Sequence, residues 1–134
     1  MEPKNSPCKI EVRYAETDQM GIVHHSVYAV WFEQARTQYF RENGADYAEM
    51  EREGYGCPVL ELSVQYRNPT RYGEFVEIET TAIRVDRLRF RVDYKLTVDG
   101  KLCTTGFTLH CLTKDGRPTR DIPEKFLRLF KEKV

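Results

Sequence analysis

The 134-residue chain predicts an α+β protein in which a curved five-stranded antiparallel sheet wraps around one long central helix. Residues 26–43 have the length and apolar spacing of an amphipathic helix, whereas five other segments alternate apolar and polar residues with the period of strands. Short turns join most of these strands, which favours antiparallel pairing. A sheet with one apolar face needs a cover, and only the helix over 26–43 is long enough to supply it.

The first strand and the long helix are predicted from local signals. Apolar residues occupy every second position of residues 8–14, which is typical of a half-buried strand. Gly21 breaks the next segment and suits a tight loop. Ser26 fits the N-cap of a helix that ends at about Asn43, with Gly44 at the left-handed position beyond its last turn. At 1.5 Å per residue this helix extends roughly 26 Å, which is enough to cross a sheet.

The remaining elements follow the helix in order. After a short helix over 46–53, which Gly54 ends, we expect strands over 60–67, 75–85, 90–98 and 102–112 and a final short helix over 124–131. Asp99-Gly100 is a strong signal for a two-residue hairpin turn. The apolar phase changes near Thr80-Thr81, which predicts a bulge. Phe107, Leu109 and Cys111 are expected on one face of the last strand.

Composition and charge narrow the class of protein. Hydrophobic residues make up 40% and charged residues 31%, as in a soluble globular protein, and the length suits a single domain over 1–134. Lys+Arg and Asp+Glu both number 21, which argues against a dedicated nucleic-acid binder. No apolar run approaches the ~20 residues that span a bilayer, and residues 1–7 lack the apolar core of a secretory signal. The scattered cysteines indicate reduced thiols in a cytoplasmic protein: Cys8, Cys57, Cys103 and Cys111.

The segment just before the long helix carries the candidate chemistry. Asp18 lies in the expected turn, and His24 and His25 come directly before the helix. A helix N-terminus offers unpaired N–H groups and a partial positive charge, and a carboxylate beside it offers a base or a nucleophile. Taken alone, an aspartate in a loop is usually a turn or capping residue. The adjacent histidines lack the spacing of metal ligands and have no cysteine nearby, so no metal site is predicted.

A longer motif around these residues resembles a known family. Thr-Asp-Gln-Met-Gly-Ile-Val-His-His at 17–25, followed by Tyr28, Trp31-Phe32-Glu33 and Ala35-Arg36, resembles the signature of the 4-hydroxybenzoyl-CoA thioesterase-like acyl-CoA thioesterases, which have the hotdog fold. The resemblance covers almost the whole chain and is nearest to the bacterial cytoplasmic branch linked to the Tol–Pal cluster. Val27 stands where the family often has Asn, and His24 where an aromatic residue is frequent. These departures bear on substrate preference.

The resemblance implies a reaction and roles for particular residues. It places the catalytic carboxylate on Asp18, the motif histidine on His25 and the motif aromatic on Tyr28. Backbone N–H groups near His25 and Ser26 would then stabilise the oxyanion of a thioester under hydrolysis. Asp18 would either activate water or attack the carbonyl, and the residues leave both routes open. His25 would orient the site or be a structural histidine.

Other polar residues are weaker candidates. Four arginines cluster around one expected turn and suit the phosphates of coenzyme A, although charged alternation is also normal on a solvated sheet face: Arg84, Arg87, Arg89 and Arg91. A second basic group consists of Lys114, Arg117 and Arg120. Tyr14 and Trp31 are expected in the core. Glu33 and Arg36 are three residues apart and suit a surface pair.

The family also implies partners, and two other functions stay open. It implies a homodimer joined edge to edge, often a homotetramer, and exposed sheet edges do need covering. Coenzyme A enters as part of the substrate, no further cofactor is expected, and an acyl carrier protein is a possible partner. The alternatives are a hydratase or dehydratase acting on acyl thioesters, and a non-catalytic acyl-CoA or acyl-carrier binder. Release of free thiol separates the three.

Overall fold

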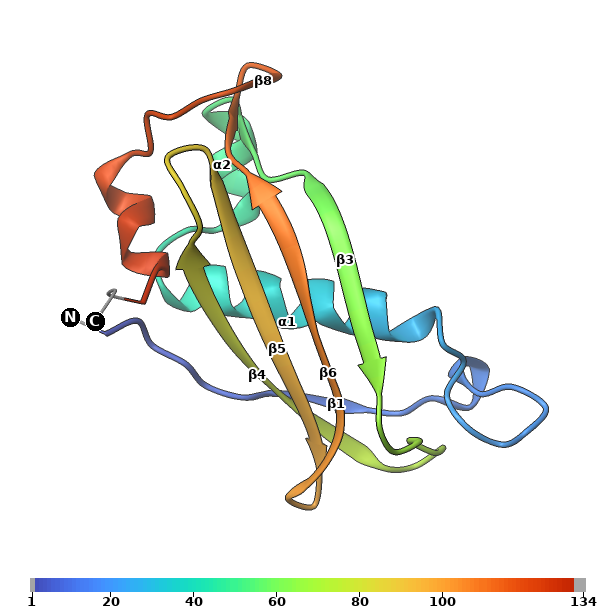
Figure 1. The fold of residues 1–134 in the computed structure, drawn as a ribbon. Helices are drawn as coiled ribbons and strands as arrows, with labels where there is room; N and C mark the ends of the chain where they lie inside the picture. Colours follow the sequence, from blue (N-terminus) through green and yellow to red (C-terminus); the bar gives the residue numbers. More distant parts are fainter. Residues whose placement is uncertain (1, 132–134) are drawn as a thin grey trace.

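The computed structural model describes residues 2–131, in which one helix lies across one face of an antiparallel sheet (Figure 1). The helix is α1 (Val27–Glu42). The sheet has the order β1-β4-β5-β6-β3, formed by β1 (Cys8–Glu11), β4 (Phe75–Arg84), β5 (Arg89–Val98), β6 (Lys101–Cys111) and β3 (Val59–Tyr66). The expected five strands and long helix are therefore present, within a few residues of the expected bounds.

Shorter elements complete the fold. These are η1 (Tyr14–Glu16), α2 (Tyr47–Arg52), β2 (Tyr55–Gly56), β7 (Thr113–Lys114), β8 (Arg117–Pro118) and η2 (Glu124–Leu129). The strands β2, β7 and β8 form a second sheet of three strands, which the sequence did not predict. The helix expected over 124–131 is the 3₁₀ helix η2. Among the described residues, no helix has both the length and the apolar character that a membrane span requires.

The core lies between α1 and the inner face of the five-stranded sheet. Phe32 of α1 stacks on Tyr94 of β5, with ring centroids 4.3 Å apart and planes 3° from parallel. Gly106 of β6 permits this contact, because a Cβ atom there would lie 2.7 Å from the Phe32 ring and 2.4 Å from the Ser63 carbonyl. The Asp99-Gly100 hairpin is confirmed, since Val98 pairs with Lys101 and both turn residues have positive φ.

Two details of the sheet differ from the expectation. β4 pairs with β5 in one continuous register, so the bulge predicted at Thr80-Thr81 is wrong. Thr80 and Ala82 are buried and continue the inner face, while the apolar residues that suggested a change of phase lie on the other face or beyond the strand. On β6 the helix-facing positions are the buried polar residues Thr104, Thr108 and His110. Phe107 and the other two expected apolar residues share the opposite face.

A chain of hydrogen bonds crosses this polar part of the core. Arg36 is only 5% exposed, and its Nη1 donates to the Tyr94 hydroxyl at 2.8 Å. That hydroxyl lies 2.7 Å from Thr108 Oγ1, which lies 2.7 Å from His110 Nε2. His110 Nδ1 lies 3.1 Å from the Cys57 carbonyl. Because arginine only donates and a carbonyl only accepts, the bonds all point the same way and the His110 proton lies on Nδ1.

The surface pair expected between Glu33 and Arg36 is therefore wrong. Arg36 points into the core, where its Nε also donates to the Tyr47 hydroxyl at 3.1 Å, whereas Glu33 is exposed. Burial and the nearby Arg36 charge lower the pKa of His110 to about 4, so the imidazole is neutral near pH 7. Burial raises the pKa of Tyr47 to about 12, so this hydroxyl keeps its proton.

Candidate active site

An open cleft of about 700 Å³ lies at the start of α1. Two segments line it, one from η1 into the following loop and one leading into the helix: Tyr14, Ala15, Glu16, Thr17, Asp18, Gln19, His24, Ser26 and Val27. In Figure 1 this region is the blue loop beside the beginning of α1. The cleft thus brings together the expected catalytic carboxylate and the N-terminus of the long helix.

A tight backbone turn positions Asp18. Its N–H donates to the Ile22 carbonyl at 2.9 Å, and the Gly21 N–H donates to the Asp18 carbonyl at 3.0 Å. Gly21 has φ +78°, which glycine adopts without strain. Asp18 Oδ1 accepts the Met20 N–H at 2.8 Å, so the side chain does act as a turn residue. Among residues 2–131 its other oxygen, Oδ2, accepts no hydrogen bond, which leaves it available to a ligand.

The start of α1 has no side-chain cap. Ser26 occupies the N-cap position, as predicted, but its hydroxyl does not bond to the first helical turn. Instead Ser26 Oγ lies 2.8 Å from His24 Nδ1, and the Ser26 N–H, which was expected at the oxyanion, donates to the same nitrogen at 3.2 Å. The Val27 N–H donates to the His24 carbonyl at 3.0 Å. The first turn therefore presents its partial positive charge to the cleft, where an anion or a developing oxyanion is stabilised.

The two histidine rings pack against each other, with centroids 4.1 Å apart, but only one of them lines the cleft. His24 is half-buried and lines the cleft, whereas His25 is exposed and is not among the lining residues. The carbonyl of His25 accepts the Tyr66 hydroxyl at 3.0 Å, which ties the loop to the edge strand β3. Within one chain the structure therefore brings His24, not the expected His25, into the cleft with Asp18.

Tyr28 lies beneath the cleft. It is buried, with its hydroxyl 2.8 Å from Thr70 Oγ1, and burial raises its pKa. Its ring packs edge-on against Trp31 at 5.2 Å and against Tyr66 at 5.3 Å. In this chain Tyr28 supports the start of α1 from the core and does not line the cleft.

Glu16 is a residue that the sequence analysis did not select. It is only 7% exposed, and its Oε1 accepts the Arg13 N–H at 2.8 Å while its Oε2 accepts the Trp31 indole N–H at 3.0 Å. Its backbone carbonyl accepts the His24 N–H at 2.8 Å. Glu16 thus connects both lining segments to α1. The signal in the sequence was the single tryptophan on the apolar face of the helix, whose N–H needs an acceptor when it is buried.

Trp31 is in the core as predicted, but the same expectation for Tyr14 is wrong. Tyr14 is 77% exposed. The strand ends at Glu11 and the alternation of buried and exposed residues continues to Arg13, after which the η1 turn directs Glu16 inward in place of Tyr14. The Tyr14 ring packs edge-on against Tyr72, with centroids 5.6 Å apart.

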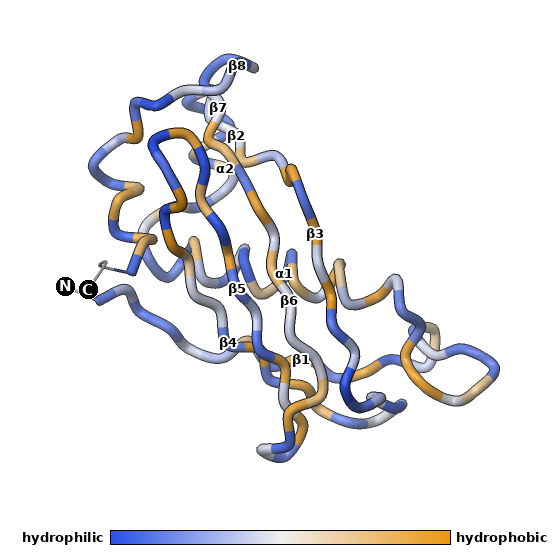
Figure 2. Tube along the Cα trace, viewed as in Figure 1, coloured by the Kyte–Doolittle hydropathy of each residue, from blue (hydrophilic) through white to orange (hydrophobic). Residues whose placement is uncertain are grey.

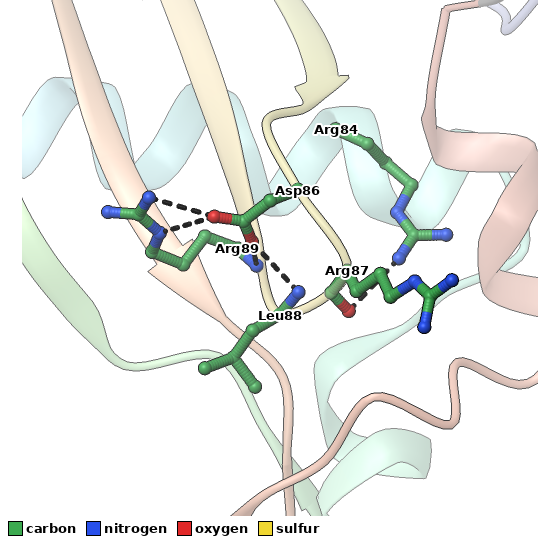
Figure 3. A network of polar contacts seen from close by, with 5 residues as sticks. All are labelled: Arg84, Asp86, Arg87, Leu88 and Arg89. Atoms are coloured by element: carbon green, nitrogen blue, oxygen red, sulfur yellow. Dashed lines mark hydrogen bonds and ion pairs between the residues drawn. The ribbon is translucent and has the colours of Figure 1, made fainter.

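The candidate phosphate-binding arginines lie at the other end of the sheet. Figure 1 shows the β4–β5 turn far along the sheet from the loop that precedes α1. Arg89 donates to Asp86 Oδ2 from Nε at 2.9 Å and from Nη2 at 2.8 Å (Figure 3). In the same turn Arg84 donates to the Arg87 carbonyl at 3.2 Å. The Arg89 hydrogen bond lowers the pKa of Asp86 to about 2. Arg91 pairs with Asp93 at 3.0 Å. One chain alone does not bring Arg87, Arg89 or Arg91 to the cleft.

The titratable residues of the described part of the chain do not gather as metal ligands do. No group of three or more His, Cys, Asp or Glu side chains among residues 2–131 has an arrangement that could hold a metal ion. His110 lies in the core and His24 at the cleft, so these histidines belong to different parts of the fold.

A helix backed by an antiparallel sheet, with its N-terminus, which has no side-chain cap, and a carboxylate in one cleft, defines an α+β protein of the hotdog class with a site suited to acyl transfer. The chain belongs to the thioesterase-like superfamily, whose family model matches residues 12–130. The prediction of a thioesterase is thereby confirmed at the level of the family.

Individual relatives agree with this membership. YneP of Bacillus subtilis, provisionally named an acyl-CoA thioesterase, is 47% identical over 72 residues, which span about half of each chain: 54% of this one and 52% of YneP. The acyl-CoA thioester hydrolase YbgC of Escherichia coli O157:H7 is 31% identical over 92% of this chain and 93% of its own. The structure of the DHNA-CoA thioesterase from Staphylococcus aureus matches with a TM-score of 0.81 and 40% identity, over 87% of this chain and 80% of that one.

Proposed function

We propose that the protein hydrolyses acyl-CoA thioesters to a free acid and coenzyme A, with Asp18 as the catalytic residue. The observation that carries the proposal is the open cleft in which the Asp18 carboxylate lies together with the start of α1, which has no side-chain cap. The family match and the names of full-length relatives such as YbgC support the same activity.

The site suits both routes of thioester hydrolysis. The thioester carbonyl would lie at the start of α1, whose N–H groups and dipole stabilise the negative oxygen of the tetrahedral intermediate. As a general base, Asp18 takes a proton from water while the hydroxide adds to the carbonyl carbon. The intermediate then collapses, the carbon–sulfur bond breaks, and the thiolate of coenzyme A leaves and is protonated. As a nucleophile, Asp18 would instead attack the carbonyl carbon and expel the thiolate of coenzyme A, and water would then hydrolyse the resulting mixed anhydride to the free acid and the Asp18 carboxylate.

A panel of acyl-CoA substrates tests the proposal against the two alternative functions. Free thiol released at a rate proportional to enzyme concentration is the expected result. A change in a double bond without thiol would indicate the hydratase or dehydratase. Binding without either reaction would indicate a non-catalytic acyl-CoA or acyl-carrier binder. Either of these outcomes contradicts the proposal.

We propose further that two chains associate through the edge strand β3. Val59, Leu60, Leu62 and Tyr66 on this strand are each about half exposed, and Figure 2 shows hydrophobic positions along it. An uncovered apolar edge strand is a template for pairing. Antiparallel pairing about a two-fold axis would set the Val59 end of one chain beside the Tyr66 end of the other.

In this dimer the arginine end of one chain would lie near the cleft of the other. Val59 pairs with His110, which pairs with Phe90, so the arginine end of the sheet is the Val59 end. The cleft lies at the Tyr66 end, where Tyr66 bonds to the loop before α1. The partner's Arg89 and Arg91 would therefore approach the cleft, and the phosphates of coenzyme A, across the dimer interface. A homotetramer of two such dimers, with all cysteines unpaired in the reducing cytoplasm, completes the proposal.

A further inference from the structure

The tetrahedral intermediate of thioester hydrolysis needs hydrogen-bond donors for its negative oxygen, and several donors at the cleft are already bonded. Among the described residues, the side chains that line the cleft include the carboxylates of Glu16 and Asp18 but no lysine or arginine. The Ser26 N–H donates to His24 Nδ1 at 3.2 Å, and the Val27 N–H donates to the His24 carbonyl at 3.0 Å. These two backbone groups at the start of α1 are therefore engaged within the protein.

Most side-chain donors along the cleft are engaged or exposed as well. The Thr17 hydroxyl donates to the Tyr14 carbonyl at 2.7 Å, and Ser26 Oγ lies 2.8 Å from His24 Nδ1. Tyr14 and Gln19 are exposed, so ordering either side chain around a substrate costs conformational entropy. The half-buried ring of His24 is the remaining donor.

The contacts of the His24 ring determine which nitrogen carries its proton. Nδ1 accepts the Ser26 N–H, so it holds a lone pair and not a hydrogen. In the neutral imidazole the proton is then on Nε2, and among residues 2–131 no protein atom accepts a hydrogen bond from this nitrogen. His24 therefore carries a free N–H donor in the cleft that also holds Asp18.

The His24 ring is held in place before a substrate binds. Besides the bond from Ser26, the His24 backbone N–H donates to the Glu16 carbonyl at 2.8 Å, and the ring packs against His25 with centroids 4.1 Å apart. A donor that is already oriented needs little reorganisation when negative charge develops beside it. The Ser26 N–H lies at the positive end of the α1 dipole and polarises the ring, and a neutral imidazole at a helix N-terminus can polarise a carbonyl.

We propose that the Nε2–H of His24 donates a hydrogen bond to the thioester carbonyl oxygen as that oxygen becomes negative. This inference rests on the proposed function, because it adds a second catalytic residue to the same cleft. When Asp18 or the water that it activates adds to the carbonyl carbon, the C=O electron pair moves onto the oxygen, which accepts the N–H more strongly. No proton leaves the ring, and the hydrogen bond weakens again when the carbon–sulfur bond breaks. The contact therefore raises kcat more than it lowers KM.

Two variants separate the roles of the two ring nitrogens. His24→Asn keeps an acceptor for the Ser26 N–H, because an asparagine side chain readily accepts the backbone N–H two residues on, but it is too short to replace Nε2. His24→Gln places an amide N–H near the position of Nε2 and lacks an acceptor at that of Nδ1. The two variants are thus matched controls for each other.

The assay uses the acyl-CoA of the substrate panel that wild type hydrolyses fastest. We expect His24→Asn to lower kcat by about 10²-fold, the usual effect of removing one oxyanion donor, with KM changed less than about threefold and thermal unfolding unchanged. His24→Gln should unfold at a lower temperature, because the Ser26 N–H loses its acceptor, and yet keep a higher kcat than His24→Asn.

A thioether analogue separates this role from substrate binding. S-hexyl-CoA has a methylene group in place of the carbonyl of hexanoyl-CoA, so it offers no oxygen to His24. Calorimetry should give wild type and His24→Asn the same Kd for it within about twofold, because the proposed hydrogen bond belongs to the reacting carbonyl.

The contrary outcomes separate this inference from the proposed function. A kcat of His24→Asn within about threefold of wild type would overturn the assignment of His24 and leave the proposed hydrolysis intact. A kcat of His24→Gln at or below that of His24→Asn would overturn it as well. Weaker binding of S-hexyl-CoA by His24→Asn would make His24 a binding residue and likewise overturn it. Absence of thiol release from every acyl-CoA by wild type would instead remove the proposed function itself.

Discussion

At the scale of single residues, the site depends on Glu16 as well as on Asp18. Asp18 was selected from the sequence because its surrounding motif is long, whereas Glu16 resembles an ordinary loop carboxylate until Trp31 is placed beside it. A buried carboxylate needs donors, and Glu16 finds them in the Arg13 backbone and the Trp31 indole. These bonds connect the segment that carries Asp18 to the helix whose N-terminus completes the cleft.

Replacing Glu16 with Gln is therefore expected to destabilise the protein. The free energy of unfolding should fall by about 1.5–3 kcal/mol, the usual contribution of hydrogen bonds to a charged group. Urea unfolding followed by circular dichroism measures this change. Glu11→Gln makes the same chemical change at an exposed position of β1 and should alter stability by less than about 0.5 kcal/mol. Equal effects of the two substitutions would show that Glu16 does not anchor the site.

At the scale of elements, the buried hydrogen-bond chain joins α1 to β5, β6 and the segment before β3. Its direction runs from the Arg36 guanidinium to the Cys57 carbonyl, so it needs a neutral His110 with its proton on Nδ1. In this hydrogen-bond chain the Thr108 hydroxyl donates its proton to His110 Nε2. If Nε2 were also protonated, two donors would face each other and this hydrogen bond would be lost. The chain therefore makes the packing of α1 against the sheet sensitive to acid.

Stability is accordingly expected to fall as the pH falls from about 6.5 to about 4. His110 has a folded-state pKa of about 4, below the ordinary value near 6.5, so in this window the unfolded chain binds more protons. The loss from this residue is at most roughly 3 kcal/mol. Urea unfolding at several pH values should show that His110→Gln lacks this part of the slope. A variant with the wild-type slope would contradict the neutral assignment.

At the scale of the whole molecule, local patterns predicted more than long-range ones. The long helix, the Asp99-Gly100 hairpin and the five main strands follow from periodicity and turn residues, and they are present. The sheet of β2, β7 and β8 was not predicted because strands of two residues have no periodicity. Arg36 was placed on the surface because a sequence does not show that tyrosines from α2 and β5 converge on it.

The location of the candidate site was predictable from local sequence, whereas several contacts within it were not. Its cleft comes from one continuous stretch, residues 14–27, so its location was predictable. The sequence did not show that His24 lines the cleft, nor that the His25 carbonyl accepts the Tyr66 hydroxyl, because Tyr66 is distant in sequence. The exposure of Tyr14 depends on where the first strand ends. The distance between the arginine turn and the cleft depends on strand register, which only the assembled sheet defines.

The proposed association through β3 also belongs to this scale. Leu62→Glu places a charge on the exposed apolar edge and is expected to shift the protein from dimer to monomer in sedimentation experiments. Val85→Glu introduces the same charge at an exposed position just after β4 and serves as the control. If Leu62→Glu and wild type sediment alike as dimers, the interface is not β3. Lost activity in the monomer would support a site completed by the partner.

The central claim is that the Asp18 carboxylate performs thioester hydrolysis, and its most direct test is thiol release by Asp18→Asn. Asparagine keeps the oxygen that accepts the Met20 N–H, so the loop should be preserved while the base or nucleophile is lost. We expect kcat to fall by at least about 10²-fold with unchanged thermal unfolding. Asp99→Asn makes the same chemical change in the exposed β5–β6 hairpin turn and should retain activity. Near-normal turnover by Asp18→Asn would contradict the account.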